Sequence, residues 1–523
     1  MKPHSFFVFA CLLVSLNYIS CQRKLSGKYK PLTFTILQIN DVYEIEPLSG
    51  GEEGGMARVA KVRKDLVKDN KNTIAVLAGD FVSPSFMGTL KYNGQRLAGK
   101  QMVDVMNATG IDYVTFGNHE FDIEKRQLQE RINESEFTWV SSNVEEKRVD
   151  GSTGPFMKYK NGTSEVIRPY VIHQFIYEKG QSIRLGIIGV TLPFNKTDSI
   201  VYDDIYSSVK DTYERIKDSC DVIVGLTHLE MEMDKKLAKV VPGLDLIIGG
   251  HEHMHMYQEV GKVLICKADA NAKSACIHKV TYAPDTREVN VISELKIINS
   301  SVPFDSEVNK TVQKWVAFRD SVVYSLGFVA KEKLMRADLP LEAREPFIRS
   351  QSTNFTRLVT NSLLYSFPEA DIAILNSGSI RIDDQMKGEI TQADILRSLP
   401  FGGSLSLVKL TGEELLKILN IGTAVYQKGS GGFLQIEGAE RKNNVWVLNG
   451  KQIILSNTYT AVMPTFLSKG KEKNLEFINK FTQTTPDALA NTSIDKAYSK
   501  NDVRNSVITY IKSGMKSPLW VNE

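Results

Sequence analysis

The sequence has little of several features that define other classes of protein. Its 523 residues contain five cysteines, too few for a scaffold held together by disulfides. The formal net charge is only +3, so we do not expect nucleic-acid binding through a basic surface. No long apolar run follows the N-terminal segment, which argues against a transmembrane span. The composition is instead that of a globular chain, and its length predicts two domains.

The N-terminal segment has the pattern of a signal peptide over residues 1–21. A short basic start is followed by an apolar stretch over residues 6–16, too short to span a bilayer. Cys21 has two interpretations: the lipid-modified first residue of a bacterial lipoprotein, or a cysteine near an ordinary cleavage site. Either predicts an extracytoplasmic protein that is secreted, periplasmic or on the cell surface.

The rest of the chain alternates short apolar runs with helical patterns. This alternation predicts an α/β fold in which helices cover both faces of a sheet. We expect a first domain over 30–302, a connector helix over 303–326 and a second α/β domain over 327–523. Strands are predicted at 33–39, 73–78, 113–116, 183–190, 222–226, 244–248, 371–375 and 404–410, and helices at 56–67 and 306–324.

Five polar segments stand at the ends of apolar runs in the first domain. Polar residues past the ends of parallel strands collect in one crevice, so we expect these segments to meet. Aspartate, asparagine and histidine can hold two neighbouring divalent ions, which clamp a phosphate and activate water. The segments lie at 40–43, 79–80, 117–122, 227–228 and 249–253.

Within these segments, Asp80 is the candidate bridge between two ions, because a shared carboxylate offsets their repulsion. Gly79 permits the tight turn that exposes it. Asp41 suits one ion, and the other candidate ligands are Asn118, His228, His251 and His253.

His119 is a candidate for a different role. It can sit above the metals and hydrogen-bond the phosphate or the leaving oxygen, while Asp122, three residues on, orients the imidazole and keeps it protonated.

This ordered set resembles the calcineurin-like metallophosphoesterases. Gly54-Gly55-x-Ala57-Arg58 and the second domain narrow the resemblance to the 5′-nucleotidase family, over about residues 32–515. It implies an N-terminal four-layer β-sandwich flanked by helices, a connector helix and a C-terminal α/β substrate-binding domain.

The resemblance also implies roles. Two divalent ions (Zn, Mn, Mg or Fe) bind, and water activated by them attacks phosphorus without a phosphoenzyme. The first ion is expected on Asp41, Asp80 and His253, and the second on Asp80, Asn118, His228 and His251. His119 and Asp122 are expected to be the catalytic dyad.

Tyr43 departs from the family pattern, because relatives carry a histidine ligand of the first metal at that position. A neutral phenol is a poor ligand, whereas a phenolate is a good hard one. We therefore predict weaker binding at the first site, with activity retained.

In the second domain, the resemblance assigns substrate binding. Phe401 and Phe466 are expected to stack on the two faces of a base. Arg381, after the segment that begins at Asn376, is expected to bind the substrate phosphate. Arg349 is a further candidate that aligns loosely.

A second departure follows Phe466. Relatives have an aspartate that binds the ribose hydroxyls, and this chain reads Gly470-Lys471-Glu472-Lys473. Glu472 is the candidate replacement. Its greater length and the flanking lysines leave room for a more anionic substrate.

The sequence thus predicts a dimetal phosphohydrolase that releases phosphate from nucleoside 5′-monophosphates in nucleotide catabolism. The enzymatic alternatives are a 2′,3′-cyclic phosphodiesterase with 3′-nucleotidase activity and a nucleotide-sugar hydrolase. The non-enzymatic alternative is a catalytically weak, nucleotide-binding surface protein. The expected partner is a small nucleotide.

Overall fold

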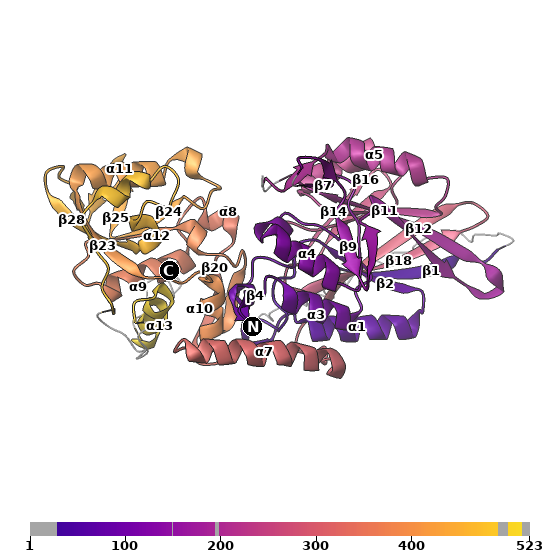
Figure 1. The fold of residues 1–523 in the computed structure, drawn as a ribbon, viewed down its shortest axis with the longest axis horizontal. Coiled ribbons are helices and arrows are strands. Elements are labelled where there is room, and N and C mark those ends of the chain that lie inside the picture. Colours follow the sequence, from indigo (N-terminus) through magenta and orange to yellow (C-terminus); the bar gives the residue numbers. More distant parts are fainter. Residues whose placement is uncertain (1–28, 149, 194–197, 490–499, 515–523) are drawn as a thin grey trace, which may run out of the picture.

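Two α/β domains lie side by side in the computed structural model of this protein, and one long helix runs beneath both (Figure 1). The structure describes residues 29–148, 150–193, 198–489 and 500–514. The predicted signal peptide and Cys21 lie outside these residues. In the described part of the chain, no helix combines the length and the apolar character needed to cross a bilayer.

The first domain is built from two six-stranded sheets packed face to face. In one sheet the order is β19 (Glu288–Ile297), β18 (Ser274–Ala283), β1 (Leu32–Ile39), β2 (Thr73–Ala78), β5 (Tyr113–Thr115) and β6 (Thr138–Trp139). In the other it is β11 (Tyr170–Ile176), β12 (Ser182–Thr191), β14 (Val222–His228), β15 (Leu246–Gly249), β17 (Val263–Lys267) and β16 (Met256–Val260).

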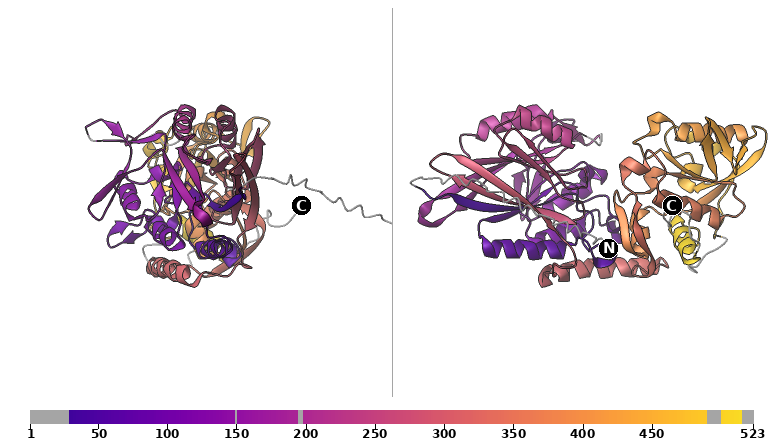
Figure 2. Two further views of the ribbon diagram at one scale, coloured as in Figure 1. Left: turned by 90° about the vertical axis from the view of Figure 1, so that its right-hand side faces the viewer. Right: turned by 180° about the vertical axis from the view of Figure 1, so that it is seen from behind.

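Apolar side chains of both sheets form the core between them, with Phe34, Ile36 and Val76 facing Leu185, Val224 and Ile248. Helices cover the outer faces (Figure 2). On the first sheet they are α1 (Met56–Asp69) and α3 (Lys100–Thr109), and α7 (Ser306–Ser325) packs on these two helices; on the second sheet they are α5 (Ile205–Ile216) and α6 (Met231–Val240).

This four-layer sandwich is the fold that the resemblance implied. The expectation of helices on both faces of one sheet was wrong, because each sheet has helices on one face and the other sheet on its second face. Strands such as Thr73–Ala78 are buried along their whole length in either arrangement, so their apolar runs do not distinguish a helix cover from a sheet cover.

The second domain has one mixed sheet between helices. Its order is β24 (Leu434–Glu437), β21 (Ile372–Asn376), β28 (Thr458–Pro464), β23 (Leu405–Thr411) and β29 (Gln483–Thr484). One face packs against α9 (Asn354–Ser366), α10 (Gln392–Ser398) and α13 (Val503–Lys512), and the other against α11 (Gly412–Gly422) and α12 (Thr465–Ser468).

Helix α11 begins with Thr411 as its N-cap. The Thr411 hydroxyl accepts a hydrogen bond from the backbone N–H of Glu414 (3.3 Å), and the Glu414 carboxylate accepts one from the N–H of Thr411 (2.8 Å). This reciprocal capping box satisfies two N–H groups that a helix start otherwise leaves unpaired.

The helix predicted over 306–324 is α7, and it packs on the first domain. Val312, Trp315 and Val316 are buried there, and the indole N–H of Trp315 donates to Asp104 (2.8 Å). The domain limits 30–302 and 327–523 stay predictions.

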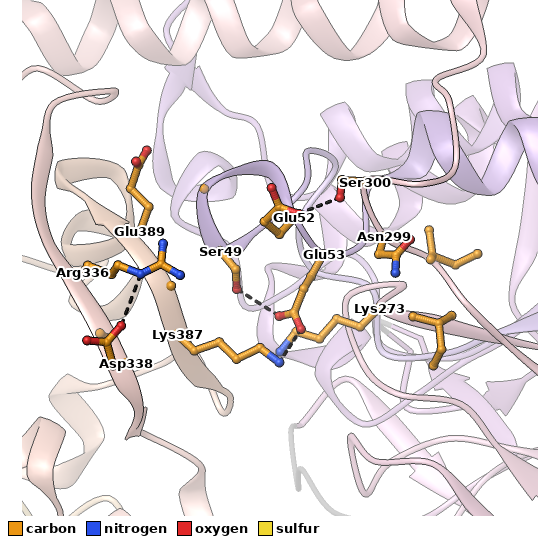
Figure 3. Close-up of a pocket in the computed structure, with 15 residues that line it drawn as sticks. Ser49, Glu52, Glu53, Lys273, Asn299, Ser300, Arg336, Asp338, Lys387 and Glu389 are labelled. Carbon is orange, nitrogen blue, oxygen red and sulfur yellow. Dashed lines mark hydrogen bonds and ion pairs between the residues drawn. The ribbon is translucent and has the colours of Figure 1, made fainter. Parts of the chain in front are cut away.

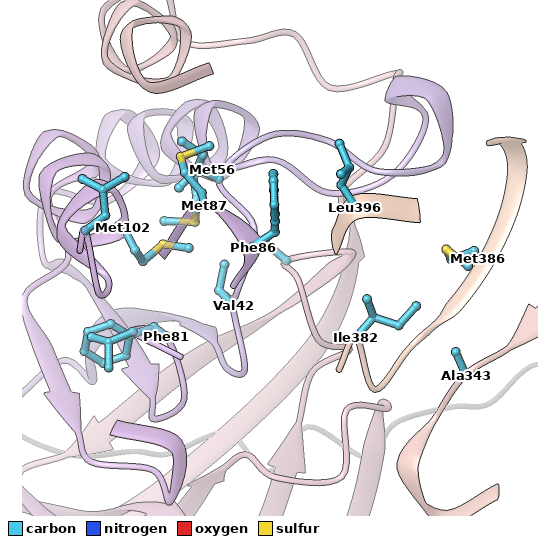
Figure 4. Close-up of a cluster of buried hydrophobic side chains, with 14 of the residues drawn as sticks. Val42, Met56, Phe81, Phe86, Met87, Met102, Ala343, Ile382, Met386 and Leu396 are labelled. Carbon is cyan, nitrogen blue, oxygen red and sulfur yellow. The ribbon is translucent and has the colours of Figure 1, made fainter. Parts of the chain in front are cut away.

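Apolar packing is continuous across the domain boundary. Figure 4 shows Val42 and Phe86 of the first domain near Ile382 and Leu396 of the second, and all four belong to one buried cluster. A pair of strands, β20 (Lys333–Glu342) and β22 (Gln385–Thr391), lies at this boundary. The second domain therefore packs on the loops that follow β1 and β2, and we call this packing the seated arrangement.

Candidate metal centre and substrate pocket

The five polar segments meet at the carboxyl ends of the two sheets of the first domain. Strands β1, β2 and β5 run parallel in one sheet, and β14 and β15 run parallel in the other. The segments follow or complete these strands, so their side chains converge although up to about 210 residues separate them. The clustering that the sequence predicted is therefore what the fold produces.

Asp80 lies between the two groups of candidate ligands. Its Oδ2 atom is 3.0 Å from the Tyr43 hydroxyl on one side and 3.2 Å from Nε2 of His228 on the other. Its Oδ1 atom accepts a hydrogen bond from the backbone N–H of His119 (2.8 Å). A carboxylate in this position is placed to bridge two ions.

On one side of Asp80, the Oδ1 atom of Asp41 is buried without a hydrogen-bond partner and lies 3.3 Å from Nε2 of His253. Ligand atoms of Asp41, Asp80 and His253 all lie within 4.8 Å of one another. A buried carboxylate oxygen that lacks a partner is costly unless a cation neutralises it. These oxygen and imidazole donors fit a divalent metal.

On the other side, Asn118 and His228 face each other, with Oδ1 and Nε2 3.1 Å apart. Nδ1 of His228 lies 2.8 Å from the carbonyl oxygen of Ala78. Donation to that carbonyl leaves Nε2 as the ligating nitrogen. The ring of His251 lies 5.3 Å from that of His228, and burial followed by the charge of His228 lowers the pKa of His251 to about 3.

The backbone around these ligands is strained. Asp41, Asp80, His251 and His253 all have positive φ, at 53°, 58°, 94° and 61°. Such conformations cost on the order of 1–3 kcal/mol each in non-glycine residues and cluster at functional sites. Gly117 leaves space for the Asp80 carboxylate. A Cβ atom at position 117 would lie only 2.0 Å from Oδ1 of Asp80.

His119 and Asp122 form the predicted pair. Nδ1 of His119 lies 2.6 Å from Oδ2 of Asp122, in a short helical turn over His119–Asp122. Burial lowers the pKa of His119, but the carboxylates of Asp80 and Asp122 raise it by more, to about 9. The imidazolium is thus favoured, and it can donate a proton.

Tyr43 is buried with its hydroxyl between Asp80 and Nε2 of His253, 3.0 Å from each. Burial, and then the Asp80 carboxylate, raise the pKa of Tyr43 well above its usual range. In this environment the phenol keeps its proton and donates to Asp80. Its place among the ligands matches the predicted position, and its role as a ligand stays a prediction.

The second domain contains a cavity of about 390 Å³. Phe401 and Phe466 both line it and are 65% and 48% exposed. Exposed aromatic rings at a cavity are candidates for ligand contacts. Asn376 also lines the cavity, and its side-chain amide donates to Glu472 (3.1 Å). The structure therefore brings these four predicted residues together.

Two candidate arginines lie in the second domain, and one of them approaches both Phe401 and Tyr43. Arg381 lies with its guanidinium carbon 5.8 Å from the centre of the Phe401 ring, and it shares a small gap with Tyr43. Arg349 pairs with Glu345. Glu345 stands four residues before Arg349 in the chain.

Three residues near the centre were not singled out from the sequence. Glu120 accepts hydrogen bonds from backbone N–H groups of Asp80 (2.9 Å) and Phe81 (2.7 Å), among others, and its place in Gly117–Asp122 was the available signal. Lys267 is buried and pairs with Glu252 (2.5 Å). Asp383, from the second domain, contacts His253. No pattern in the sequence indicates the last two.

Together, the fold and the site define a two-domain metallophosphoesterase. Residues 34–255 match the family model of the calcineurin-like phosphoesterases, and residues 336–480 match the 5′-nucleotidase C-terminal domain. The chain belongs to the 5′-nucleotidase family and is a metal-dependent phosphoric ester hydrolase.

Relatives support this assignment. The 5′-nucleotidase of Bos taurus is 25% identical over 507 residues, which cover 84% of each chain. The trifunctional nucleotide phosphoesterase protein YfkN of Bacillus subtilis is 29% identical over 413 residues, or 73% of this chain and 27% of YfkN. The 5′-nucleotidase precursor of Thermus thermophilus shares the fold, with a TM-score of 0.64 at 22% identity, covering 92% of this chain and 96% of that one.

Proposed function

We propose that this protein hydrolyses nucleoside 5′-monophosphates at a pair of divalent ions. The observation that carries the proposal is the cavity lined by Phe401 and Phe466, because Arg381 lies 5.8 Å from the centre of the Phe401 ring and lines a small gap together with Tyr43 of the first domain. A base between the two rings can place its phosphate beside Arg381. The names of the relatives support nucleotide substrates, since they include 5′-nucleotidases.

The residues present fit two ions that share Asp80. Asp41 and His253 would hold the first, with the protonated Tyr43 beside them, and Asn118, His228 and His251 would hold the second. When bound, such ions neutralise phosphate charge and lower the pKa of a coordinated water. The identity of the metal among Zn, Mn, Mg and Fe is left to measurement.

The chain's own residues supply the other parts of the reaction. The Arg381 guanidinium suits bidentate binding of phosphate oxygens, which fixes the phosphorus for in-line attack. His119, held by Asp122, donates a hydrogen bond to a phosphate oxygen or a proton to the leaving ribose oxygen. The glycine-rich turns keep these groups close together, because a side chain at Gly117 would displace Asp80.

A substrate panel tests this function. Phosphate release from 5′-monophosphates, 2′,3′-cyclic nucleotides, 3′-monophosphates and nucleotide sugars is measured with Mn²⁺, Zn²⁺ or Mg²⁺ added after chelation. We expect the highest kcat/KM on 5′-monophosphates. No release from any nucleotide by the folded protein would contradict the proposal and favour the nucleotide-binding alternative.

One observation favours a second candidate, a cyclic phosphodiesterase with 3′-nucleotidase activity or a nucleotide-sugar hydrolase. Glu472, in place of the expected aspartate, is hydrogen-bonded to Asn376, so the ribose hydroxyls meet a different acceptor. The relative YfkN is named for three nucleotide phosphoesterase functions. Higher kcat/KM on these substrates than on 5′-monophosphates would establish this alternative.

We further propose that residues 1–21 direct export and that the mature protein acts outside the cytoplasm, as names such as the 5′-nucleotidase precursor suggest for relatives. Mass spectrometry of the mature N-terminus distinguishes a lipid-modified Cys21 from simple cleavage. An intact residue 1 on protein recovered from the native organism would contradict export.

A further inference from the structure

The two nitrogens of the His253 ring face different domains. Nε2 points to the candidate first metal site, 3.3 Å from Oδ1 of Asp41 and 3.0 Å from the Tyr43 hydroxyl. Nδ1 points to the second domain, where it lies 3.0 Å from Oδ2 of Asp383 and 3.0 Å from the Asp383 carbonyl oxygen. An imidazole that ligates through Nε2 donates its Nδ1–H to such an acceptor, which fixes its tautomer and orientation.

Asp383 is itself held in place. Its Oδ1 atom accepts a hydrogen bond from the backbone N–H of Glu345 (2.5 Å), and its φ of 39° lies in the left-handed region. Asp383 lies in the loop before β22, so these contacts and not a strand ladder determine its position. Asp383 is therefore a fixed acceptor, and its contact with His253 is unlike the adaptable pairs of exposed side chains.

The next residue reinforces the contact. Asp384 pairs with Lys273 of the first domain (2.5 Å) and accepts a hydrogen bond from the amide of Asn271 (3.4 Å). Asn271 in turn accepts a hydrogen bond from the backbone N–H of Tyr43 (3.1 Å). The second domain thus touches His253 directly and Tyr43 through one intermediate.

The other metal site is oriented differently. Nδ1 of His228 lies 2.8 Å from the carbonyl oxygen of Ala78, within the first domain. His228 of the second site is therefore oriented by its own domain, whereas His253 of the first site is oriented by a carboxylate 130 residues away in the chain. Of these two histidines, only His253 depends on how the second domain is seated.

We propose that Asp383 is a positioning residue for the first metal site, so that metal binding there and the seating of the second domain are thermodynamically linked. The inference rests on the metal-binding role of His253 in the proposed function. Linkage is reciprocal: if the seated domain raises first-site affinity by some factor, metal binding favours the seated arrangement by the same factor. The second site is outside this linkage.

The domain boundary also provides a matched control. A cleft of about 530 Å³ lies between the domains. In it, Lys387 of the second domain reaches Glu53 of the first (Figure 3). Their ion pair is 2.6 Å long, and the Lys387 side chain is 52% exposed. Lys387→Met therefore removes a cross-domain ion pair without removing the His253 contact.

The first experiment measures metal affinity in the full chain. Mn²⁺ is titrated calorimetrically into chelator-treated wild type, Asp383→Asn and Lys387→Met. Outer-shell partners are typically worth 10–100-fold in metal affinity, so we expect Asp383→Asn to weaken one of two ions by about that factor. The other ion and both ions of Lys387→Met should bind as in wild type. Equal binding of both ions by Asp383→Asn would overturn the inference.

Two further variants make the result specific. Asparagine is a suitable replacement for Asp383 because it tolerates left-handed φ. Asp383→Ala serves as a second variant. Thermal unfolding in chelator checks that each variant is folded. In a His253→Ala background, Asp383→Asn should have no further effect on Mn²⁺ affinity. An additional loss there would show that Asp383 acts by another route and would also overturn the inference.

The reciprocal experiment follows hydrogen exchange in residues 377–391. Mn²⁺ should slow exchange of this segment in wild type and in Lys387→Met, and should lose that effect in Asp383→Asn. A residue with a merely structural role would change exchange equally with and without Mn²⁺. Phosphate release by wild type is scored separately, so unchanged metal binding in Asp383→Asn refutes the inference while the proposed function stands.

Discussion

The candidate metal centre and the cavity lined by Phe401 and Phe466 are built in opposite ways. At the metal centre, Asp41 and Asp80 are buried, their backbone is in the left-handed region, and Gly117 leaves no room for a side chain. At the cavity, Phe401 and Phe466 are among the more exposed large apolar residues. Packing and backbone together determine the ligand positions, whereas the cavity is lined by side chains that can change without disturbing the fold.

We therefore expect substitutions among the candidate ligands to abolish activity, and substitutions in the cavity to change which substrate binds. The link between the two regions lies at the domain boundary, where Arg381 and Asp383 of the second domain approach Tyr43 and His253 of the first. Substitutions on each side of that boundary test whether catalysis and substrate binding can be changed independently.

The largest effect is expected for Asp80→Ala. Loss of the bridging carboxylate should lower kcat by about 10³-fold or more, beyond the loss from a single hydrogen-bond donor at an active site, and should reduce bound metal measured by elemental analysis. Asp338→Ala, at a side chain that is 87% exposed, is the control. Wild-type turnover in Asp80→Ala would refute the assigned centre.

The next effect separates catalysis from metal binding. His119→Ala should lower kcat by about 10²–10⁴-fold, the usual contribution of a positioned acid or base, with metal content unchanged. Asp122→Asn should cause a smaller loss, because it acts through His119. Loss of bound metal in His119→Ala would instead place this histidine among the ligands.

A third substitution tests the cavity. Phe401→Ala should lower kcat/KM for a 5′-monophosphate by roughly 5–150-fold, the equivalent of about 1–3 kcal/mol of base stacking. Turnover of a small aryl phosphate, which has no base, should stay the same. Ile454→Ala, at an exposed apolar residue of the same domain, is the matched control. An equal loss on both substrates would show that Phe401 serves the chemistry or the fold.

The smallest effect is expected for Tyr43→His. Replacing a buried phenol by an imidazole should tighten Mn²⁺ binding at the first site by about tenfold, which corresponds to about 1.4 kcal/mol. Calorimetric titration measures this change, and the second ion is the internal reference. Unchanged affinity and turnover would mean that Tyr43 does not contribute to the first site.

Much of the metal centre could be predicted because its residues follow buried strands whose apolar runs are visible in the sequence. The run before Asp80 and the short motif that contains His119 placed both residues near their observed positions. The pairing of the sheets could not be predicted in this way, since an apolar run such as Thr73–Ala78 is buried equally by a helix or by a second sheet.

The sequence by itself determined the order of the strands along the chain, the ligand types and the family resemblance, because these depend on local periodicity and on motifs a few residues long. Only the tertiary structure decided which distant groups meet. Glu472 and Asn376 lie 96 residues apart, and His253 and Asp383 lie 130 residues apart. The first contact depends on how the second domain folds and the second contact on how the two domains pack, and no local pattern encodes either geometry.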